Sequence, residues 1–556
     1  KQSKMLSLAS TETPLIGGAT PRCAQLESTR EWTESSQICA VNQTSTQVQT
    51  RSRLEHLSRL STSHAASCTR QTSIVCTIGP SCASAEKIRE MIEAGMTLAR
   101  VSTSHGTHEE HREIIQRIRE VRKDFPDVYV AIALDTRGPE IRTGPVKSPD
   151  GVDLVSGSTV KLLADETNTE ECTSDVIFMT YGKAVSSDLK VNDVIFIDSG
   201  QISVKVVERN EGSLTCIVEN GGRLYSRKSV NLPSCHIDLP ILSEKDKDSL
   251  RLAIEERVDM VFASYVRCGD DVAGVKRVLA ELGSPEKEIL VIGKIENQPG
   301  VDKIDEIIEA ADGILIARGK LGVEAEVNRV TLIQKEIIAK CICAGRPVIV
   351  ATQMLESMRV HPRATRAECS DVANAVLDGT DCVMLSEETA VGKYPVQAVA
   401  FMDKICCESE AANFHRSPLP VPRSSEHDEC RLETLAATAA TTVCMFNATV
   451  IVLASRTGRL AQQCSRFRPP VPIVALCRSP RLARQLQLFR GVLPFHNDRV
   501  VFPHDSALAV EETLRIAVET GKRRGFIQKG DALVYVTGWP KEEGGRHSML
   551  QLVIAE

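Results

Sequence analysis

The sequence predicts an α/β protein whose centre is a closed barrel of eight parallel strands, each followed by a helix. Eight short runs rich in Val, Ile and Leu occur after residue 72, and stretches with helical apolar periodicity separate most of them. Continuously apolar strands that alternate with helices are typical of a parallel sheet covered on both faces. A count of eight such units favours closure into a β/α barrel.

The first two strand–helix units show the pattern most clearly. The helix after the first strand places Ile88, Met91 and Ile92 on one face, and Ser84 and Gly95 suit its N-cap and its end. The next helix carries an apolar face of Ile114, Ile115, Ile118 and Val121. The eight predicted strands are 72–78, 97–101, 128–134, 258–263, 289–293, 312–317, 347–352 and 381–386.

Three other segments depart from this alternation. After the third strand, short alternating runs separated by Gly and Asn predict a small all-β insert. Beyond a linker rich in Pro, Arg and Ser, three further apolar runs predict an open α/β domain. The N-terminal arm is rich in Ser, Thr and Gln, which predicts disorder apart from a short helix near 54–60. The predicted divisions are therefore the arm (1–70), the barrel (71–142 with 241–415), the insert (143–240) and the C-terminal domain (416–556).

Composition excludes several classes of function. The net charge of -6 gives no reason to expect nucleic acid or an anionic membrane surface as a partner. No apolar run approaches the roughly 18 residues of a membrane span, and the N-terminus lacks the apolar core of a secretory signal. The 19 cysteines are scattered, with no CxxC pair or metal-ligand spacing, which predicts free thiols in a reducing compartment. We therefore expect a cytoplasmic protein.

Polar side chains follow every predicted barrel strand. Barrel enzymes carry their chemistry at the carboxyl ends of the strands, so we expect these side chains to converge on one site. Lys294 and Glu296 lie two residues apart at a strand end and therefore point to the same side, a pairing that suits phosphate and its metal. The residues at the strand ends are Gly79 and Pro80; Arg100, Ser102, Ser104 and His105; Asp135, Thr136 and Arg137; Ser264; Lys294 and Glu296; Arg318, Gly319 and Lys320; Thr352 and Gln353; and Ser386.

Eight motifs, taken together and in order, resemble those of the pyruvate kinase family. They are IVCTIGPS, SHGTHEEH, LDTRGPEIRTG, VENGG, VNLP, KIEN, ATQMLESM and DVANAVLDG. The resemblance spans nearly everything after residue 70. It implies a TIM-type (β/α)8 barrel with an inserted small β-barrel lid domain and a C-terminal α/β domain. It also implies transfer of the phosphoryl group of phosphoenolpyruvate to ADP, giving pyruvate and ATP in glycolysis.

The resemblance implies roles for individual catalytic residues. Arg100 would hold the transferring phosphoryl group, and Lys294 would stabilise charge as that group leaves phosphoenolpyruvate. Thr352 would lie near the enolate carbon that is protonated, and Ser386 would belong to the same proton relay. The implied substrate-binding residues are Arg100, Lys294, Gly319, Lys320 and Thr352.

Metal and nucleotide sites follow from the same resemblance. Glu296 would bind Mg²⁺ or Mn²⁺. The implied K⁺ ligands are Ser102, Ser104, Asp135 and Thr136, with Glu140 at the position tied to potassium dependence. The implied nucleotide-binding residues are Pro80, His105, Arg142 and Lys228. The expected partners are phosphoenolpyruvate, ADP or ATP, and further subunits in a homo- or hetero-tetramer.

Lys320 is the most serious departure from the family pattern. Where the family has ARGDLG, this chain has Ala317-Arg-Gly-Lys320-Leu-Gly, so an ammonium replaces the carboxylate that joins Glu296 on the metal. A unit charge about 4 Å from another is worth about 4 kcal/mol at an effective dielectric constant near 20, and a divalent ion feels double. We therefore expect weak metal binding and impaired turnover. Two alternatives stay open: Lys320 turns into solvent and water completes the metal shell, or the chain is a catalytically inactive paralogue.

Further departures lie around the same cleft and in the C-terminal domain. The loop of Ser455, Arg456, Thr457 and Gly458 resembles the family's phosphate-binding regulatory loop. Its last hydroxyl is replaced, however, and two carboxylates on the opposite wall would repel phosphate, so we expect a structural and subunit-contact domain. The departures from the family's residues are Ser102, Glu110, Ser199 and Glu387 near the cleft, and Leu460, Thr513, Glu542 and Glu543 in the C-terminal domain.

Overall fold

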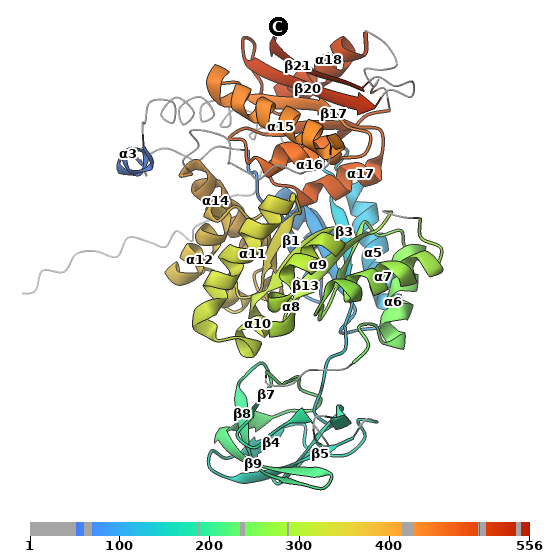
Figure 1. The fold of residues 1–556 in the computed structure, drawn as a ribbon, viewed down its shortest axis with the longest axis vertical. Coiled ribbons are helices and arrows are strands. Elements are labelled where there is room, and N and C mark those ends of the chain that lie inside the picture. Colours follow the sequence, from blue (N-terminus) through green and yellow to red (C-terminus); the bar gives the residue numbers. More distant parts are fainter. Residues whose placement is uncertain are drawn as a thin grey trace, which may run out of the picture.

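The computed structural model arranges the chain as three lobes along one axis, with the barrel between the insert and the C-terminal domain (Figure 1). Among the described residues, no helix combines the length and apolar character needed to cross a bilayer. The N-terminal arm beyond its short helix and most of the linker before the C-terminal domain lie outside the described residues. The described residues are 52–60, 69–165, 167–183, 185, 188–233, 239–285, 288–413, 427–498, 500, 508–540 and 546–556.

The central lobe is a closed barrel of eight parallel strands, which confirms the predicted fold class. The third strand begins three residues later than predicted, because its pairing with the second strand starts at Ala131 opposite Leu98. The strands are β1 (Ser73–Thr77), β2 (Leu98–Ser102), β3 (Ala131–Asp135), β12 (Met260–Ala263), β13 (Leu290–Ile295), β14 (Gly313–Ala317), β15 (Val348–Ala351) and β16 (Cys382–Leu385).

Helices surround the barrel, and several begin at side-chain caps that the sequence makes recognisable. Ser84 accepts the N–H of Lys87 at 3.2 Å and starts the first helix, as predicted. Thr107 and Glu110 cap the second helix reciprocally. The helices of this lobe are α4 (Ala85–Glu93), α5 (His108–Arg122), α6 (Glu244–Glu255), α7 (Gly269–Glu281), α8 (Gln298–Asp302), α9 (Ile304–Ala310), α10 (Arg318–Glu324), η2 (Val327–Arg329), α11 (Val330–Ala344), η3 (Glu356–Arg359), α12 (Arg366–Leu377), α13 (Glu387–Ala390) and α14 (Pro395–Ala411).

The C-terminal domain closes the end of the barrel at which the strands begin. Leu488, from the short helix η4 (Leu486–Leu488), is fully buried among the side chains that fill the barrel interior. Asp259 and Asp381 each precede a barrel strand and accept an N–H of the neighbouring strand, at 2.9 and 3.1 Å. Arg484 donates to Asp259 at 2.8 Å, and Arg468 grips both oxygens of Asp381 at 2.9 Å. The amino ends of the strands are therefore sealed, and only the carboxyl ends remain for a site.

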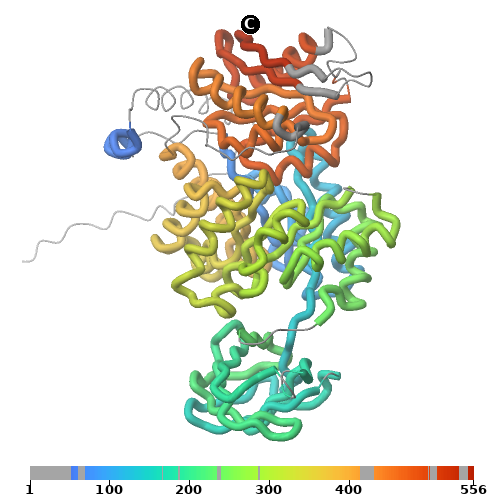
Figure 2. Tube along the Cα trace, viewed as in Figure 1, coloured from blue at the N-terminus to red at the C-terminus, as the bar shows by residue number. Residues whose placement is uncertain are grey.

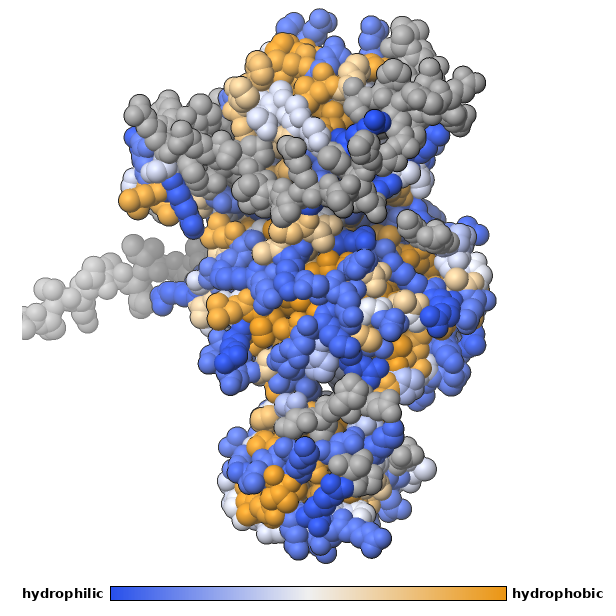
Figure 3. All heavy atoms as spheres, in the orientation of Figure 1, coloured by the Kyte–Doolittle hydropathy of each residue, from blue (hydrophilic) through white to orange (hydrophobic). Residues whose placement is uncertain are grey.

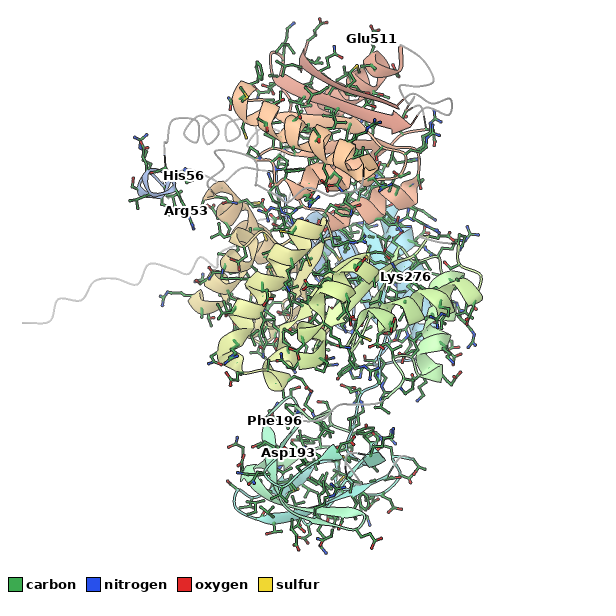
Figure 4. The ribbon with its side chains drawn as sticks, viewed as in Figure 1. Arg53, His56, Asp193, Phe196, Lys276 and Glu511 are labelled. Atoms are coloured by element: carbon green, nitrogen blue, oxygen red, sulfur yellow. The ribbon has the colours of Figure 1, made fainter. Side chains whose placement is uncertain are left out.

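The insert leaves the barrel after β3, on the side of the open carboxyl ends. Its strands form a six-stranded and a two-stranded sheet around one apolar core. Figure 2 shows it as a separate lobe, and Figure 4 marks it with Asp193 and Phe196, far from Lys276 on the barrel. Asn231 donates to Glu324 of the barrel at 2.7 Å. The strands are β4 (Val152–Leu154), β5 (Thr159–Ala164), β6 (Val176–Met179), β7 (Val194–Ile197), β8 (Ile202–Asn210), β9 (Ser213–Asn220), β10 (Gly222–Leu224) and β11 (Val230–Asn231).

The C-terminal domain is an open α/β domain, as predicted, but its sheet has five strands rather than three, with apolar cores on both faces. Its edge strand β21 runs antiparallel to the other strands. In the view of Figure 3 the barrel surface is mainly hydrophilic, with smaller apolar patches. The N-terminal helix is α3 (Arg53–Ser58), and the elements of this domain are α15 (His427–Phe446), β17 (Val450–Ala454), α16 (Arg459–Arg466), β18 (Ile473–Cys477), α17 (Pro480–Gln485), β19 (Val492–His496), α18 (Leu508–Arg523), β20 (Ala532–Pro540) and β21 (Arg546–Ile554).

The buried pair of Arg468 and Asp381 gives the first testable prediction. Asp381→Ala would leave the Arg468 guanidinium without its partner at the domain junction, and we expect a loss of about 3–5 kcal/mol in the free energy of unfolding, measured by urea denaturation. Asp153→Ala removes an exposed pair with Arg223 and serves as the control, with an expected loss below about 1 kcal/mol. Equal losses in both variants would contradict a structural role for the junction.

Candidate active site

Asp135, at the end of β3, is the centre of the charged groups at the barrel mouth. It is 1% exposed and accepts from Arg100 Nε at 2.5 Å and from Lys294 Nζ at 2.9 Å. Ser264, directly after β12, accepts from Lys294 at 2.7 Å, and its hydroxyl oxygen lies 3.1 Å from Asp135 Oδ1. Burial alone would raise the pKa of Asp135, but Arg100 and Lys294 outweigh it and the pKa lies below its usual value. Three strand ends thus fix two cations around one ionised carboxylate.

Glu296 lies beside this group and is held by the backbone of the neighbouring strand end. Its carboxylate is 2% exposed, with one oxygen 3.4 Å from Lys294 Nζ. The other oxygen accepts the N–H of Tyr265 at 2.8 Å. Tyr265 takes a left-handed backbone angle, φ 58°, which is uncommon for a bulky side chain and aims this amide at the carboxylate.

Lys320 reaches into the site, so the structure is against the alternative in which it turns into solvent. Its ammonium lies 3.7 Å from Glu296 Oε1, 3.6 Å from Glu140 Oε1 and 4.1 Å from the centre of the Tyr265 ring. Glu140 also pairs with Arg142. Burial alone would raise the pKa of Glu140, but Lys320 and Arg142 hold it below its usual value.

These ion pairs join into one chain of alternating sign. Each carboxylate lies between two cations, and the chain begins and ends on an arginine. Four cations therefore face three carboxylates, so the chain carries a net charge of about +1 and favours an incoming anion. In order, its members are Arg100, Asp135, Lys294, Glu296, Lys320, Glu140 and Arg142.

The residues around Glu296 do not fit a divalent cation. Both of its oxygens already face donors or cations, and the neighbouring position supplies an ammonium where a second carboxylate would be needed. Among the described residues, no three His, Cys, Asp or Glu side chains form a group that could hold a metal.

The K⁺ ligands implied by the resemblance lie on two adjacent strand ends. Ser102 is in register with Asp135, whose two carboxylate oxygens are engaged by Arg100, Lys294 and Ser264. Thr136 accepts the Ser264 N–H on its hydroxyl and the Ser264 hydroxyl on its carbonyl. Ser104 lies half-buried in the loop that follows β2. A role for these residues in binding K⁺ stays a prediction.

Thr352 occupies a strained turn at the end of β15. It and Gln353 both have left-handed backbone angles, φ 70° and 54°, which cost free energy unless the surroundings enforce them. Arg318 enforces them, because its guanidinium donates to both carbonyls at 2.8 and 3.2 Å and pairs with Asp371 at 2.6 Å. The Thr352 hydroxyl accepts the Gly319 N–H at 2.7 Å. The predicted substrate residues Gly319 and Thr352 therefore lie together.

Ser386 follows β16 and carries a buried hydroxyl that has no partner in the described structure. Its N–H donates at 2.7 Å to Glu388, a fully buried carboxylate that also accepts the Leu355 N–H. Burial raises the pKa of Glu388, with a smaller contribution from Glu387. A hydroxyl without a partner and a carboxyl of raised pKa two residues later in the chain are groups that can take part in proton transfer, and the relay role of Ser386 stays a prediction.

The predicted nucleotide residues divide into two groups. Arg142 and Lys228 lie on adjacent segments at the root of the insert, where Arg142 donates to the carbonyl of Arg227 at 2.8 Å. Lys228 pairs with Asp198 at 2.9 Å. Pro80 and His105 are exposed in the loops after β1 and β2, and within the described residues no contact joins them to the first group.

The loop of the predicted allosteric site lies between β17 and α16. Ser455 is buried and accepts the N–H of Gly458 at 2.9 Å, while Arg456 and Thr457 are exposed. Leu460 is buried in the domain core rather than facing a ligand. The opposite wall, with Glu542 and Glu543, lies outside the described residues, so the expected lack of sugar-bisphosphate activation stays a prediction.

A β/α barrel that gathers cations around a buried carboxylate at its open strand ends has the form of an enzyme site for an anionic substrate. Residues 69–399 match the family model described as "Pyruvate kinase, barrel domain", and residues 433–553 match "Pyruvate kinase, alpha/beta domain". The chain belongs to the pyruvate kinase family. Members of this family generally use Mg²⁺ and K⁺.

Named relatives cover most of the chain. It is 44% identical over 515 residues to pyruvate kinase PKLR of Homo sapiens, and the alignment covers 90% of this chain and 88% of that protein. It is 41% identical to the pyruvate kinase of Agaricus bisporus, covering 87% of this chain and 91% of that protein. The pyruvate kinase of Schizosaccharomyces pombe is 39% identical, covering 88% and 95%.

No role was predicted from the sequence for Tyr265, which contacts the carboxylates of Glu296 and Glu140 and the ammonium of Lys320. A left-handed backbone angle is not signalled by a tyrosine in the sequence, and the one available signal was the position of Tyr265 two residues after the end of β12. Ser264 was noted at a strand end but not as the link between Lys294 and Asp135.

Glu356 gives a prediction of pH dependence. Burial, with Glu388 and Glu387, raises the pKa of Glu356 to about 7, against the opposing effect of Arg359. An acid whose pKa is higher in the folded than in the unfolded protein stabilises the fold when the pH is below the unfolded pKa. That contribution is lost as the pH rises through the folded pKa of about 7. Glu356→Gln removes this titration. We therefore expect the variant to gain thermal stability over wild type at about pH 8 but little at about pH 4, measured by circular dichroism melting.

Glu113→Gln, on the exposed face of α5, is the control and is expected to show no such pH-dependent difference. A Glu356→Gln variant that gains as much at acid pH as at alkaline pH would contradict the assigned titration.

Proposed function

We propose that this chain binds phosphoenolpyruvate and ADP at the barrel mouth and transfers the phosphoryl group to ADP, giving pyruvate and ATP in the cytoplasm. The observation that carries the proposal is the group of Arg100 and Lys294 fixed around buried Asp135. The family's tetramers suggest that it works as a homo- or hetero-tetramer. Lys320 lowers the rate, because it removes the metal-binding character of the site.

Each retained side chain has a defined task in this reaction. Arg100 and Lys294 hold the phosphoryl oxygens while the bond to the enol oxygen breaks and a bond to the terminal ADP oxygen forms. Arg142 and Lys228, at the root of the insert, attract the nucleotide phosphates. The enolate left behind takes a proton at carbon beside Thr352, with Ser386 in the relay. These tasks rest on fixed cations and hydroxyls, so no step is assigned to a divalent ion.

A second candidate is a non-catalytic paralogue that binds phosphorylated metabolites or assembles with active subunits. The specific observation in its favour is the placement of Lys320 Nζ 3.7 Å from Glu296 and 3.6 Å from Glu140. Under this candidate the phosphate-binding cations serve binding alone.

The proposed reaction is tested by restoring the family carboxylate. Pyruvate formation from phosphoenolpyruvate and ADP is measured with K⁺ and with Mg²⁺ or Mn²⁺ for wild type and Lys320→Asp. We expect turnover of wild type to lie at least ~10²-fold below the variant, about 2.7 kcal/mol in transition-state stabilisation. Lys123→Asp, the same change at an exposed residue directly after α5, is the control and should match wild type.

Equal and high rates for wild type and Lys320→Asp would contradict the assigned effect of Lys320. If both proteins are inactive, the second candidate is favoured over the first. Native mass spectrometry of the chain mixed with an active family member then tests whether mixed tetramers form.

A further inference from the structure

We propose that Lys320 is a built-in cation, and that this site binds a small phosphorylated carboxylic acid without any divalent metal. The inference rests on the proposed function for the class of ligand. It goes further by assigning to a side chain of the protein the positive charge for which the family generally uses a metal ion. The contacts of Lys320, the charge balance around it and its exposure carry the argument.

The surroundings of Lys320 have the form of a cation site. Its ammonium lies 3.7 Å from the carboxylate of Glu296 and 3.6 Å from that of Glu140, both largely shielded from solvent. The centre of the Tyr265 ring is 4.1 Å from the same ammonium. Tyr265 locks this arrangement, because its N–H donates to Glu296 at 2.8 Å and its hydroxyl to Glu140 at 3.4 Å. The carboxylates and the ring are thus arranged around a positive charge that the chain itself supplies.

The charge balance depends on the sign at position 320. With Lys320 in place, every carboxylate of the ion-pair chain lies between two cations. A carboxylate at this position would put three negative groups side by side, Glu296 and Glu140 on either side of it, and an added cation or protonation of one carboxyl would relieve their repulsion. A metal ion is therefore favoured with Asp at this position and is repelled with Lys.

Lys320 can meet a ligand as well as its carboxylate neighbours. Its side chain is 35% exposed, whereas those of Glu296 and Lys294 are 2% and 7% exposed. An ammonium that is held on one side and open on the other can pair with one anionic group. Arg100 and Lys294, further along the same chain, are placed for a second one. A ligand with both a phosphate and a carboxylate has the matching pair of charges.

Calorimetry with phosphoglycolate tests the inference, because this phosphorylated carboxylic acid binds without being able to transfer its phosphoryl group to form pyruvate. For wild type we expect the dissociation constants in EDTA and in Mg²⁺ to agree within ~2-fold. For Lys320→Asp we expect binding at least ~10-fold weaker in EDTA and recovery on addition of Mg²⁺. Lys320→Met, which removes the charge without adding a carboxylate, should bind more weakly than wild type in both conditions, and Lys123→Met should match wild type.

Titration with Mn²⁺, followed by electron paramagnetic resonance, provides a readout that needs neither ligand nor turnover. We expect Lys320→Asp to bind Mn²⁺ at the site and wild type to show at least ~10-fold weaker binding. Circular dichroism melting of each variant confirms that it is folded.

The inference is overturned if wild type loses phosphoglycolate in EDTA as strongly as Lys320→Asp does, if it binds Mn²⁺ as tightly, or if no form binds phosphoglycolate. Absence of pyruvate formation would instead count against the proposed reaction and would leave the metal-free binding and Mn²⁺ results unchanged. The two proposals therefore fail in different measurements.

Discussion

The organisation of the site depends on one buried carboxylate, Asp135. Arg100 and Lys294 would repel each other at the barrel mouth without it, and its own burial would be unfavourable without them. Because Asp135 ends β3 while its partners come from β2 and β13, this local charge balance also fixes three strand ends relative to one another. Ser264 completes the arrangement from β12. Every further ion pair of the site, out to Arg142, builds on this group.

The two ends of the barrel use the same residue types, paired carboxylates and cations, for different purposes. At the amino ends, Asp259 and Asp381 pair fully with strand amides and with arginines of the C-terminal domain, which leaves nothing for a ligand. At the carboxyl ends, the carboxylates are again paired, but one more cation than carboxylate is present and Lys320 is partly exposed. The same chemistry thus gives a joint at one end and an anion-binding site at the other.

Most of the fold was predictable because its signals are local. Apolar runs gave all eight barrel strands, and Ser84 gave the start of a helix. Several candidate site residues, such as Arg100, Asp135 and Lys294, could be placed at the barrel mouth because they lie near the carboxyl ends of strands, and their roles stay predictions. The links between them were not readable, because they join residues such as Asp135 and Lys294 that are far apart in sequence. The left-handed turn at Thr352 was equally hidden, since it is enforced by Arg318 from another strand end rather than by a glycine. The orientation of Lys320 could not be predicted from its motif, because it depends on Glu140, Glu296 and Tyr265, which lie elsewhere in the sequence.

The plug formed by Leu488 has a consequence for how the chain folds during synthesis. All eight barrel strands precede this residue, the last of them ending at Leu385, so the ribosome completes the barrel strands about a hundred residues before the side chain that fills the amino end of the barrel. Until then the barrel interior lacks the side chain of Leu488, and Asp259 and Asp381 lack their arginine partners. The nascent barrel is thus an unfinished intermediate, and its completion is coupled to the folding of a domain whose described residues take no part in the ion-pair chain at its mouth.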